Sequence, residues 1–102
     1  MYSDKKEVGI KFDTGKTRYD LIPPEALQAI AEILTIGANK YGDRNWENGL
    51  SFDRVYSALE RHLQEYRLGN IADEETGRNH LDHALTNAVF LCVLAKRNKF
   101  TK

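Results

Sequence analysis

The sequence predicts a mainly α fold: a small, oligomeric bundle of three main helices preceded by an N-terminal arm or short β-hairpin. Apolar residues recur at helical spacing in three segments, and glycine-containing polar loops separate these segments. A length of 102 residues suits one domain with a single modest core. We therefore interpret residues 1–102 as a single helical domain, with the arm or hairpin over 1–22 and the helical core over 23–98.

Residues 1–22 differ in pattern from the rest of the chain. Val8, Ile10 and Phe12 alternate with glycine and lysine, which is typical of a short strand, and residues 13–15 (Asp-Thr-Gly) have turn chemistry. Two interpretations remain open. Either a small hairpin continues through residues 18–21, or an ordered arm lies over the helices.

The first helix has clear start and stop signals. Pro23 and Pro24 suit its first turn, where the missing N–H is no loss, and Gly42 is a natural terminator. Its apolar stripe consists of Leu27, Ile30, Ala31, Leu34, Ala38 and Tyr41. Ile33 and Ile36 lie off this stripe, so the helix is expected to bury a second face.

The second and third helices are bounded in the same way. Ser51 is a good N-cap for the second helix, which is expected to run to Leu68 before Gly69. The third helix is expected to start near Arg78 or Asn79, after an acidic loop, and to end in a basic tail over residues 96–99. Acids before the first turn and bases at the last turn both suit the helix dipole.

From Ala84 to Ala95 the third helix is apolar on nearly every side. In a small three-helix monomer, each helix keeps one face exposed to solvent. The pattern therefore predicts self-association, in which the third helices of two copies pack across a two-fold axis. Cys92, the single cysteine, lies within this run and is expected to be buried.

Composition limits the possible partners. Fifteen basic and fifteen acidic residues balance, so no overall field attracts a nucleic acid polymer or an anionic membrane. The longest apolar run, residues 88–95, is far shorter than the about 20 residues that span a bilayer. One cysteine allows no internal disulfide, and the N-terminus lacks the apolar stretch of a signal peptide. These features predict a cytoplasmic protein.

All three histidines lie in the second and third predicted helices. His62 shares a stripe with Val55, Tyr56, Leu59, Leu63 and Tyr66, which is expected to be buried. His80 and His83 are three residues apart and share a face. An unpaired buried polar group costs about 1–3 kcal/mol, so these rings need partners. A polar site between the two helices is the simplest interpretation.

The residues around these histidines favour a metal site or a structural network. Nitrogen and oxygen ligands on two facing helices are how helical bundles build metal centres. The candidate ligands are His62, Glu65, His80, Asp82 and His83, with Asp73 in the acidic loop. Alternatively, the histidines hydrogen-bond to carboxylates and fix the second helix against the third. The sequence favours neither interpretation over the other.

Basic and aromatic residues form a second group of candidates. Lysine and arginine suit phosphate, and the basic side chains in question are Lys16, Arg18, Lys40 and Arg61. Asn45 next to Trp46 offers an amide beside a stacking plane, which suits a purine base. The alternative to base binding is that Trp46 packs at the end of the hydrophobic core.

A set of motifs distributed along the chain carries a family resemblance. It consists of Asp13, Gly15-Lys16, Arg18–Pro24, Ala26-Leu27, Gly37-Ala38, Lys40–Gly42, Asn45-Trp46, Arg61-His62, Gly77, His80-Leu81 and His83-Ala84. With these motifs the chain resembles a family of small phage-borne proteins, the dATP/dGTP diphosphohydrolase N-terminal domain, which is similar to MazG-type all-α nucleotide pyrophosphohydrolases. The resemblance covers about residues 10 to 95.

The resemblance implies hydrolysis of a (deoxy)nucleoside triphosphate, preferably a purine, to monophosphate and pyrophosphate with Mg²⁺ or Mn²⁺. We assign catalysis to His62, Glu65 and His83, and metal binding to Glu65, Asp73, His80 and Asp82. The expected substrate-binding residues are Lys16, Arg18, Lys40, Asn45, Trp46 and Arg61. The resemblance also implies a homodimer or homotetramer through the third helix, in the cytoplasm of a phage-infected bacterium. Glu65→Gln is expected to abolish turnover.

One departure from the MazG pattern is important. MazG enzymes carry Glu-Glu-x-x-Glu on one helix and Glu-x-x-Asp on the next, whereas this chain has histidines within residues 60–65 and 80–83. Mg²⁺ prefers oxygen ligands. Three possibilities stay open: a softer metal such as Mn²⁺, carboxylates gathered from Glu60, Glu65, Asp73 and Asp82, or no catalytic metal. The last defines the alternative function, a phage protein that sequesters a nucleotide or a nucleotide-derived immune signal.

Overall fold

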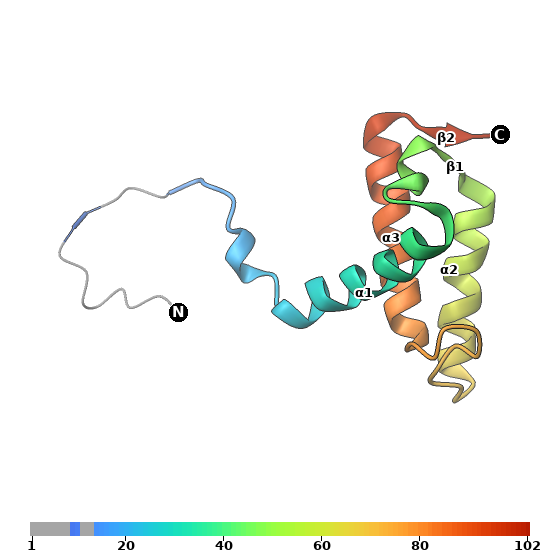
Figure 1. Cartoon of the computed structure of the whole chain (residues 1–102). Helices are drawn as coiled ribbons and strands as arrows, with labels where there is room; N and C mark the ends of the chain where they lie inside the picture. The colour runs from blue at the N-terminus through green and yellow to red at the C-terminus, as the bar shows by residue number, and fades with distance from the viewer. Residues whose placement is uncertain (1–8, 11–13) are drawn as a thin grey trace.

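The computed structural model describes residues 9–10 and 14–102 and is mainly helical, as predicted (Figure 1). Three long helices are accompanied by short 3-10 turns and a two-stranded parallel sheet. The elements in order are η2 (Tyr19–Leu21), α1 (Pro24–Tyr41), η3 (Asn45–Asn48), β1 (Leu50–Ser51), α2 (Phe52–Arg67), α3 (His80–Arg97) and β2 (Phe100–Thr101).

The helix boundaries follow the capping residues. The Ser51 hydroxyl accepts a hydrogen bond from the backbone N–H of Arg54 (3.4 Å) and caps α2. The Asn79 side-chain oxygen accepts from the N–H of Leu81 (2.7 Å) and caps α3, while Asn98 ends α3 in the left-handed conformation. These boundaries lie within two residues of the predicted ones.

The helices α2 and α3 form an antiparallel hairpin, and α1 packs mainly against α3 (Figure 1). The N-terminal half of α1 extends away from this hairpin in the view of Figure 1, and no residue of α1 is buried. Leu27 and Tyr41, at the two ends of its stripe, are 66% and 62% exposed. The expectation that this whole stripe is buried was therefore wrong, because α3 covers only part of α1.

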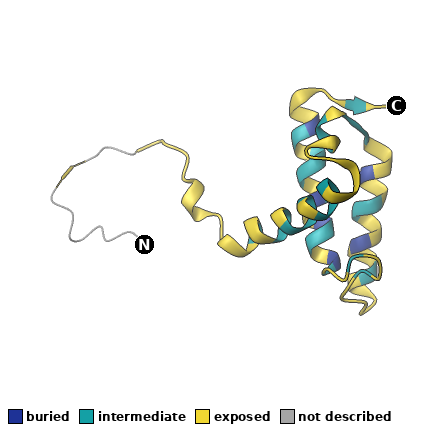
Figure 2. Cartoon of the chain, viewed as in Figure 1, coloured by how far each residue is buried: buried dark blue, intermediate teal, exposed yellow. Residues whose placement is uncertain are grey.

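The stripe of α2 is also only partly covered (Figure 2). Val55 and His62 are buried as predicted, whereas Tyr56 and Leu63 are 45% and 44% exposed, and Tyr66 is exposed as well. The cause is geometric: α3 packs along one side of this stripe and leaves the other side uncovered.

The core lies along α3. Leu94 is fully buried, and Ala84 and Thr86 are nearly so, with the Thr86 hydroxyl donating to the Asp82 carbonyl (2.9 Å). Cys92, expected to be buried, is exposed instead, because it lies on a face of α3 that neither α1 nor α2 covers. None of the helices in the described part of the chain is both long and apolar enough to cross a membrane.

The parallel sheet was not predicted. It pairs Leu50 with Phe100 and Ser51 with Thr101, and so ties the end of the chain to the start of α2. Gly49 makes this approach possible. Its φ is +124°, and a Cβ there would lie 2.8 Å from the Lys99 carbonyl oxygen, so only glycine fits. Each strand has only two residues, which is too short for an alternating pattern of apolar and polar residues to be recognised in the sequence.

Residues 14–22 contain the single turn η2 and no strand. The hairpin interpretation is therefore wrong for residues 18–21. The strand expected around residues 8–12 lies mostly outside the described residues.

Leu94→Ala is expected to lower the free energy of unfolding by about 2–5 kcal/mol, because it leaves a cavity in the core. Leu68→Ala is the matched control, since Leu68 is 66% exposed and its truncation leaves no cavity. Urea denaturation followed by circular dichroism measures both. Equal losses in the two variants would contradict this description of the core.

Candidate functional site

Two histidines meet where α2 packs against the first turn of α3. The Nδ1 atoms of His62 and His80 lie 2.8 Å apart, and the residues are only 8% and 6% exposed. With both rings neutral, one nitrogen donates a hydrogen bond and the other accepts it. The predicted polar site between these two helices is thus present, and the two buried rings satisfy each other.

Asp73 is held beside this pair by the loop that joins α2 and α3. Its Oδ2 atom accepts hydrogen bonds from the Thr76 backbone N–H (3.0 Å) and from the Thr76 hydroxyl (2.9 Å). The Asp73 backbone N–H donates to the Arg78 carbonyl (2.7 Å), which closes the loop. The hydrogen bonds of the loop therefore hold the carboxylate in a defined position.

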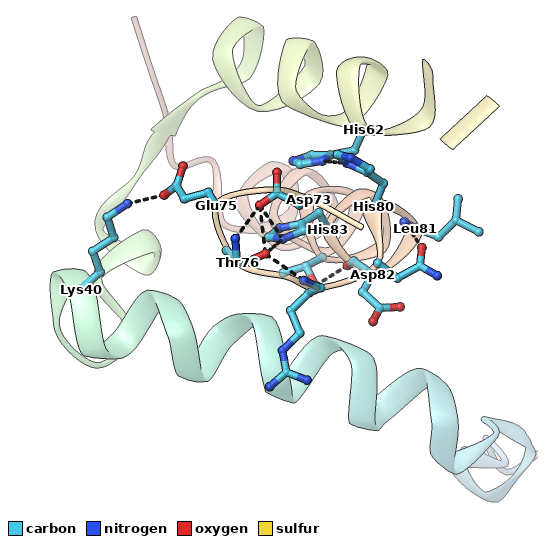
Figure 3. A network of polar contacts seen from close by, with 12 residues as sticks. Lys40, His62, Asp73, Glu75, Thr76, His80, Leu81, Asp82 and His83 are labelled. Atoms are coloured by element: carbon cyan, nitrogen blue, oxygen red, sulfur yellow. Dashed lines mark hydrogen bonds and ion pairs between the residues drawn. The ribbon is translucent and has the colours of Figure 1, made fainter. Parts of the chain in front are cut away.

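His62, Asp73 and His80 can offer one ligand atom each within 4.8 Å of one another (Figure 3). We call these three residues the ligand cluster. Two imidazole nitrogens from facing helices and one carboxylate oxygen from the loop that joins them are suitable donors for a divalent ion. Glu65, Asp82 and His83 do not belong to this cluster.

His83 borders the ligand cluster. Its ring is stacked on that of His62, with centroids 4.6 Å apart and planes 9° from parallel. Its Nε2 atom lies 2.7 Å from the Thr76 hydroxyl and 3.7 Å from Asp73 Oδ2. Burial lowers the pKa of His83, and the carboxylate of Asp73 opposes this effect. The ring is therefore neutral at pH 7.

The electrostatics favour the metal-binding forms of the cluster. Burial, followed by the neighbouring His83, His80 and Arg61, lowers the pKa of His62 to about 4. Burial raises the pKa of Asp73, but the hydrogen bonds from Thr76 outweigh this and leave the pKa below its usual value. At neutral pH the cluster thus offers a neutral imidazole and an ionised carboxylate, as metal ligands require.

A pocket of 460 Å³ lies between the C-terminal half of α1, η3 and α3. Its lining is largely apolar, and Trp46 packs against Phe90 with ring centroids 4.7 Å apart. Lys40 and Glu75, which form an ion pair of 2.7 Å, also line it, and so does His83. The pocket and the ligand cluster therefore adjoin at His83.

The structure brings some predicted site residues together and leaves others apart. Lys40, Asn45 and Trp46 line the pocket with His83, and Ile33 and Ile36, which lie off the apolar stripe of α1, line it too. The Glu65 carboxylate instead accepts a hydrogen bond from Asn70 (3.0 Å).

The remaining candidates lie elsewhere. Asp82 lines a separate surface hollow with Pro24 and other residues of α1. Arg61 is exposed beside His62. Lys16 and Arg18 lie in the arm, where Arg18 pairs with Asp20 at 2.7 Å.

Sequence reasoning missed Thr76, which fixes Asp73 and contacts His83. The signal was present, since a hydroxyl three residues after an aspartate is typical of a side-chain-capped turn. It also missed Phe90 and Gly37 as pocket residues. They lie in helices whose apolar patterns do not distinguish a pocket wall from a core.

The lowered pKa of His62 makes stability depend on pH. Its folded-state value of about 4 lies below the unfolded value of 6.5, so the unfolded chain binds more protons between these values. The free energy of unfolding is therefore expected to fall on acidification from pH 6.5 towards pH 4, by up to about 1.4 kcal/mol per pH unit.

Urea denaturation at pH 7, 6 and 5 tests this expectation, and a folded His62→Gln variant should show a shallower dependence. Unfolding free energies that do not change between pH 7 and 5 would contradict the burial of a neutral His62.

Comparison with known proteins identifies the family of the chain. The family model described as dATP/dGTP diphosphohydrolase, N-terminal, matches residues 6–102. A protein of Salmonella phage PMBT28 named dATP/dGTP diphosphohydrolase is 42% identical over 83 residues, which are 81% of this chain but only 28% of that protein. No solved structure matches. The chain thus belongs to the family of dATP/dGTP diphosphohydrolase N-terminal domains.

Proposed function

We propose that this domain hydrolyses a purine (deoxy)nucleoside triphosphate to the monophosphate and pyrophosphate with the help of a divalent ion. The observation that carries the proposal is that His83 borders both the apolar pocket and the ligand cluster. A nucleotide whose base occupies the pocket would therefore have its phosphates near the cluster. The name of the phage relative supports a nucleotide substrate.

The pocket suits a base with apolar walls and a few polar contacts. Trp46, packed on Phe90, forms one aromatic wall. Asn45, also in the lining, can hydrogen-bond to the edge of a base. We assign phosphate binding to Lys40, which must then exchange its ion pair with Glu75 for the substrate.

The ligand cluster would hold the divalent ion; the resemblance implies Mg²⁺ or Mn²⁺, and of these two the imidazole donors suit Mn²⁺ better. A bound ion polarises phosphoryl oxygens and offsets their charge. His83, neutral and next to both the cluster and the pocket, is the candidate general base for the attacking water. His62 serves as a ligand in this proposal, and Glu65 stays a candidate whose role the variants below decide.

Binding without turnover is the second candidate function. The small number of carboxylates in the ligand cluster favours it. Of Glu65, Asp73 and Asp82, only Asp73 contributes to the cluster in the described part of the chain. Sequestration of a nucleotide needs no converging acids, so the same pocket would serve it.

Incubation of the purified protein with each dNTP and NTP, with Mg²⁺, Mn²⁺ or EDTA, separates the two functions. Metal-dependent release of monophosphate and pyrophosphate, resolved by anion-exchange chromatography, is expected for purine substrates. Asp73→Asn should lower kcat/KM by more than about 100-fold, because it removes a ligand.

Asp53→Asn, in the exposed first turn of α2, is the matched control and should keep full activity. Loss of activity in Glu65→Gln would add Glu65 to the site. Nucleotides that stay intact but bound in EDTA would refute hydrolysis and establish sequestration.

Gly37→Leu tests the pocket. Gly37 lines it, and a Cβ there meets no atom within 4 Å, so a side chain at this position starts in open space at the pocket wall. Leucine also favours the helix over glycine by up to about 1 kcal/mol. We expect nucleotide affinity to fall at least about tenfold, or about 1.4 kcal/mol, with stability kept or raised.

Asn39→Leu is the control, since residue 39 is exposed on the same helix and does not line the pocket. Isothermal titration calorimetry measures both affinities. Equal affinities in the two variants would place the nucleotide elsewhere.

We also propose a homodimer or homotetramer in which α3 packs against a second copy, in the cytoplasm of a phage-infected bacterium. Leu81, Leu85 and Cys92 leave an exposed stripe on α3. The exposed residues Tyr56 and Leu63 give α2 a stripe of its own. Helices that keep apolar faces with such spacing typically pack against other helices.

Leu85→Glu, on the exposed stripe of α3, is expected to shift the protein towards monomers, because a charge cannot be buried in an apolar interface without a partner. Gln64→Glu, at an exposed position of α2, introduces the same residue outside the interface as a control. Light scattering coupled to gel filtration gives the masses, and a monomeric wild-type protein would contradict the interface.

A further inference from the structure

The ligand cluster differs from a magnesium site in its donor atoms. Mg²⁺ is a hard ion that demands oxygen ligands in near-octahedral geometry. Here two of the three donors are imidazole nitrogens, and their Nδ1 atoms lie 2.8 Å apart. Imidazole suits the first-row transition metals, with carboxylate as an acceptable companion. The residues present therefore do not fit Mg²⁺.

We propose that His62, His80 and Asp73 form a preformed transition-metal centre, which binds Zn²⁺, Co²⁺ or Mn²⁺ in the absence of nucleotide and binds Mg²⁺ only weakly. This inference deepens the proposed function by naming the class of its metal and rests on that function only for the metal's role. Metal binding itself is measured without substrate.

The two histidine ligands are preorganised. The two histidines come from different helices, are both more than nine-tenths buried, and already direct their Nδ1 atoms at one another. Two nitrogens on one tetrahedral Zn²⁺, each at about 2.0–2.1 Å, would lie roughly 3.4 Å apart. A small separation of the rings thus admits an ion, and no helix has to be rebuilt.

Neighbouring side chains hold the ligands in place. Metal-binding carboxylates are usually fixed by outer hydrogen bonds. Asp73 receives two from Thr76, and in the described part of the chain no lysine or arginine forms an ion pair with it that would compete with a cation. His83 stacks on the ring of His62, and its own Nε2 atom is hydrogen-bonded to the Thr76 hydroxyl.

The structural alternative is a histidine pair that only locks α2 to α3 through one hydrogen bond. Both arrangements stabilise the same packing, so the distinction requires added metal. It also requires a readout of individual ring nitrogens.

The chain has only three histidines, so long-range ¹H–¹⁵N spectra of the ¹⁵N-labelled protein can follow every imidazole during titration with Zn²⁺ or Mg²⁺. We expect Zn²⁺ to shift the Nδ1 signals of two histidines and to leave the third with its original Nδ1 signal. A His83→Gln variant identifies the third ring. Mg²⁺ at the same concentration should shift none of the three.

Calorimetry with Zn²⁺, Mn²⁺ and Mg²⁺ complements these spectra. We expect Zn²⁺ to bind at least about 100-fold more tightly than Mg²⁺, with Mn²⁺ between them. Asp73→Asn should weaken Zn²⁺ binding at least about tenfold, and Asp53→Asn should leave it unchanged. Asp73 is less buried than the histidines, so this variant keeps the test valid if histidine variants do not fold, as circular dichroism will show.

Two results would overturn the proposal. One is unchanged imidazole signals with Zn²⁺, which would leave a purely structural histidine pair. The other is tight Mg²⁺ binding that is lost in Glu65→Gln or Asp82→Asn, which would establish a carboxylate site instead. Transition-metal binding without nucleotide hydrolysis would uphold this centre and refute only the hydrolytic function.

Discussion

The hydrogen bond between His62 and His80 determines how α2 pairs with α3. Two imidazoles are buried at the interface of α2 and α3, and their Nδ1 atoms satisfy each other at 2.8 Å. Burial of polar rings is tolerable only when they are paired. The α2–α3 hairpin therefore has its register fixed by a polar contact in its interior.

This constraint places the other functional groups. The loop that joins the two helices passes beside the histidine pair. Within this loop, Asp73 is hydrogen-bonded to Thr76 and Arg78, and these bonds hold its carboxylate close to the two rings. One turn after His80, His83 stacks on His62 and lines the neighbouring pocket. The ligand cluster and the pocket are thus two consequences of one helix pairing.

Much of this arrangement was predictable from local chemistry. Proline, serine and asparagine at helix starts fixed the helix limits to within two residues, since capping depends on neighbours in the sequence. The burial of His62 followed from its spacing to Val55. What failed were statements about which faces are covered. Tyr56, Leu63 and Cys92 are exposed because coverage depends on where a second helix lies, and a single helix pattern does not contain that information.

The site shows the same division. The histidines were identifiable by residue type and spacing, whereas Glu65 and Asp82 share their helices but lie outside the cluster. Ile36 and Phe90 became pocket residues only through the packing of α1 on α3. The parallel pairing of residues 50–51 with residues 100–101 is a long-range contact with no local signal.

A crystal structure of the protein soaked with Mn²⁺ and a non-hydrolysable purine triphosphate analogue, with anomalous data collected for manganese, would test the site most directly. We expect an anomalous peak bonded to His62, His80 and Asp73, with the base between α1 and α3 beside Trp46. A peak at Glu65 or Asp82, or a base bound outside this pocket, would contradict this expectation.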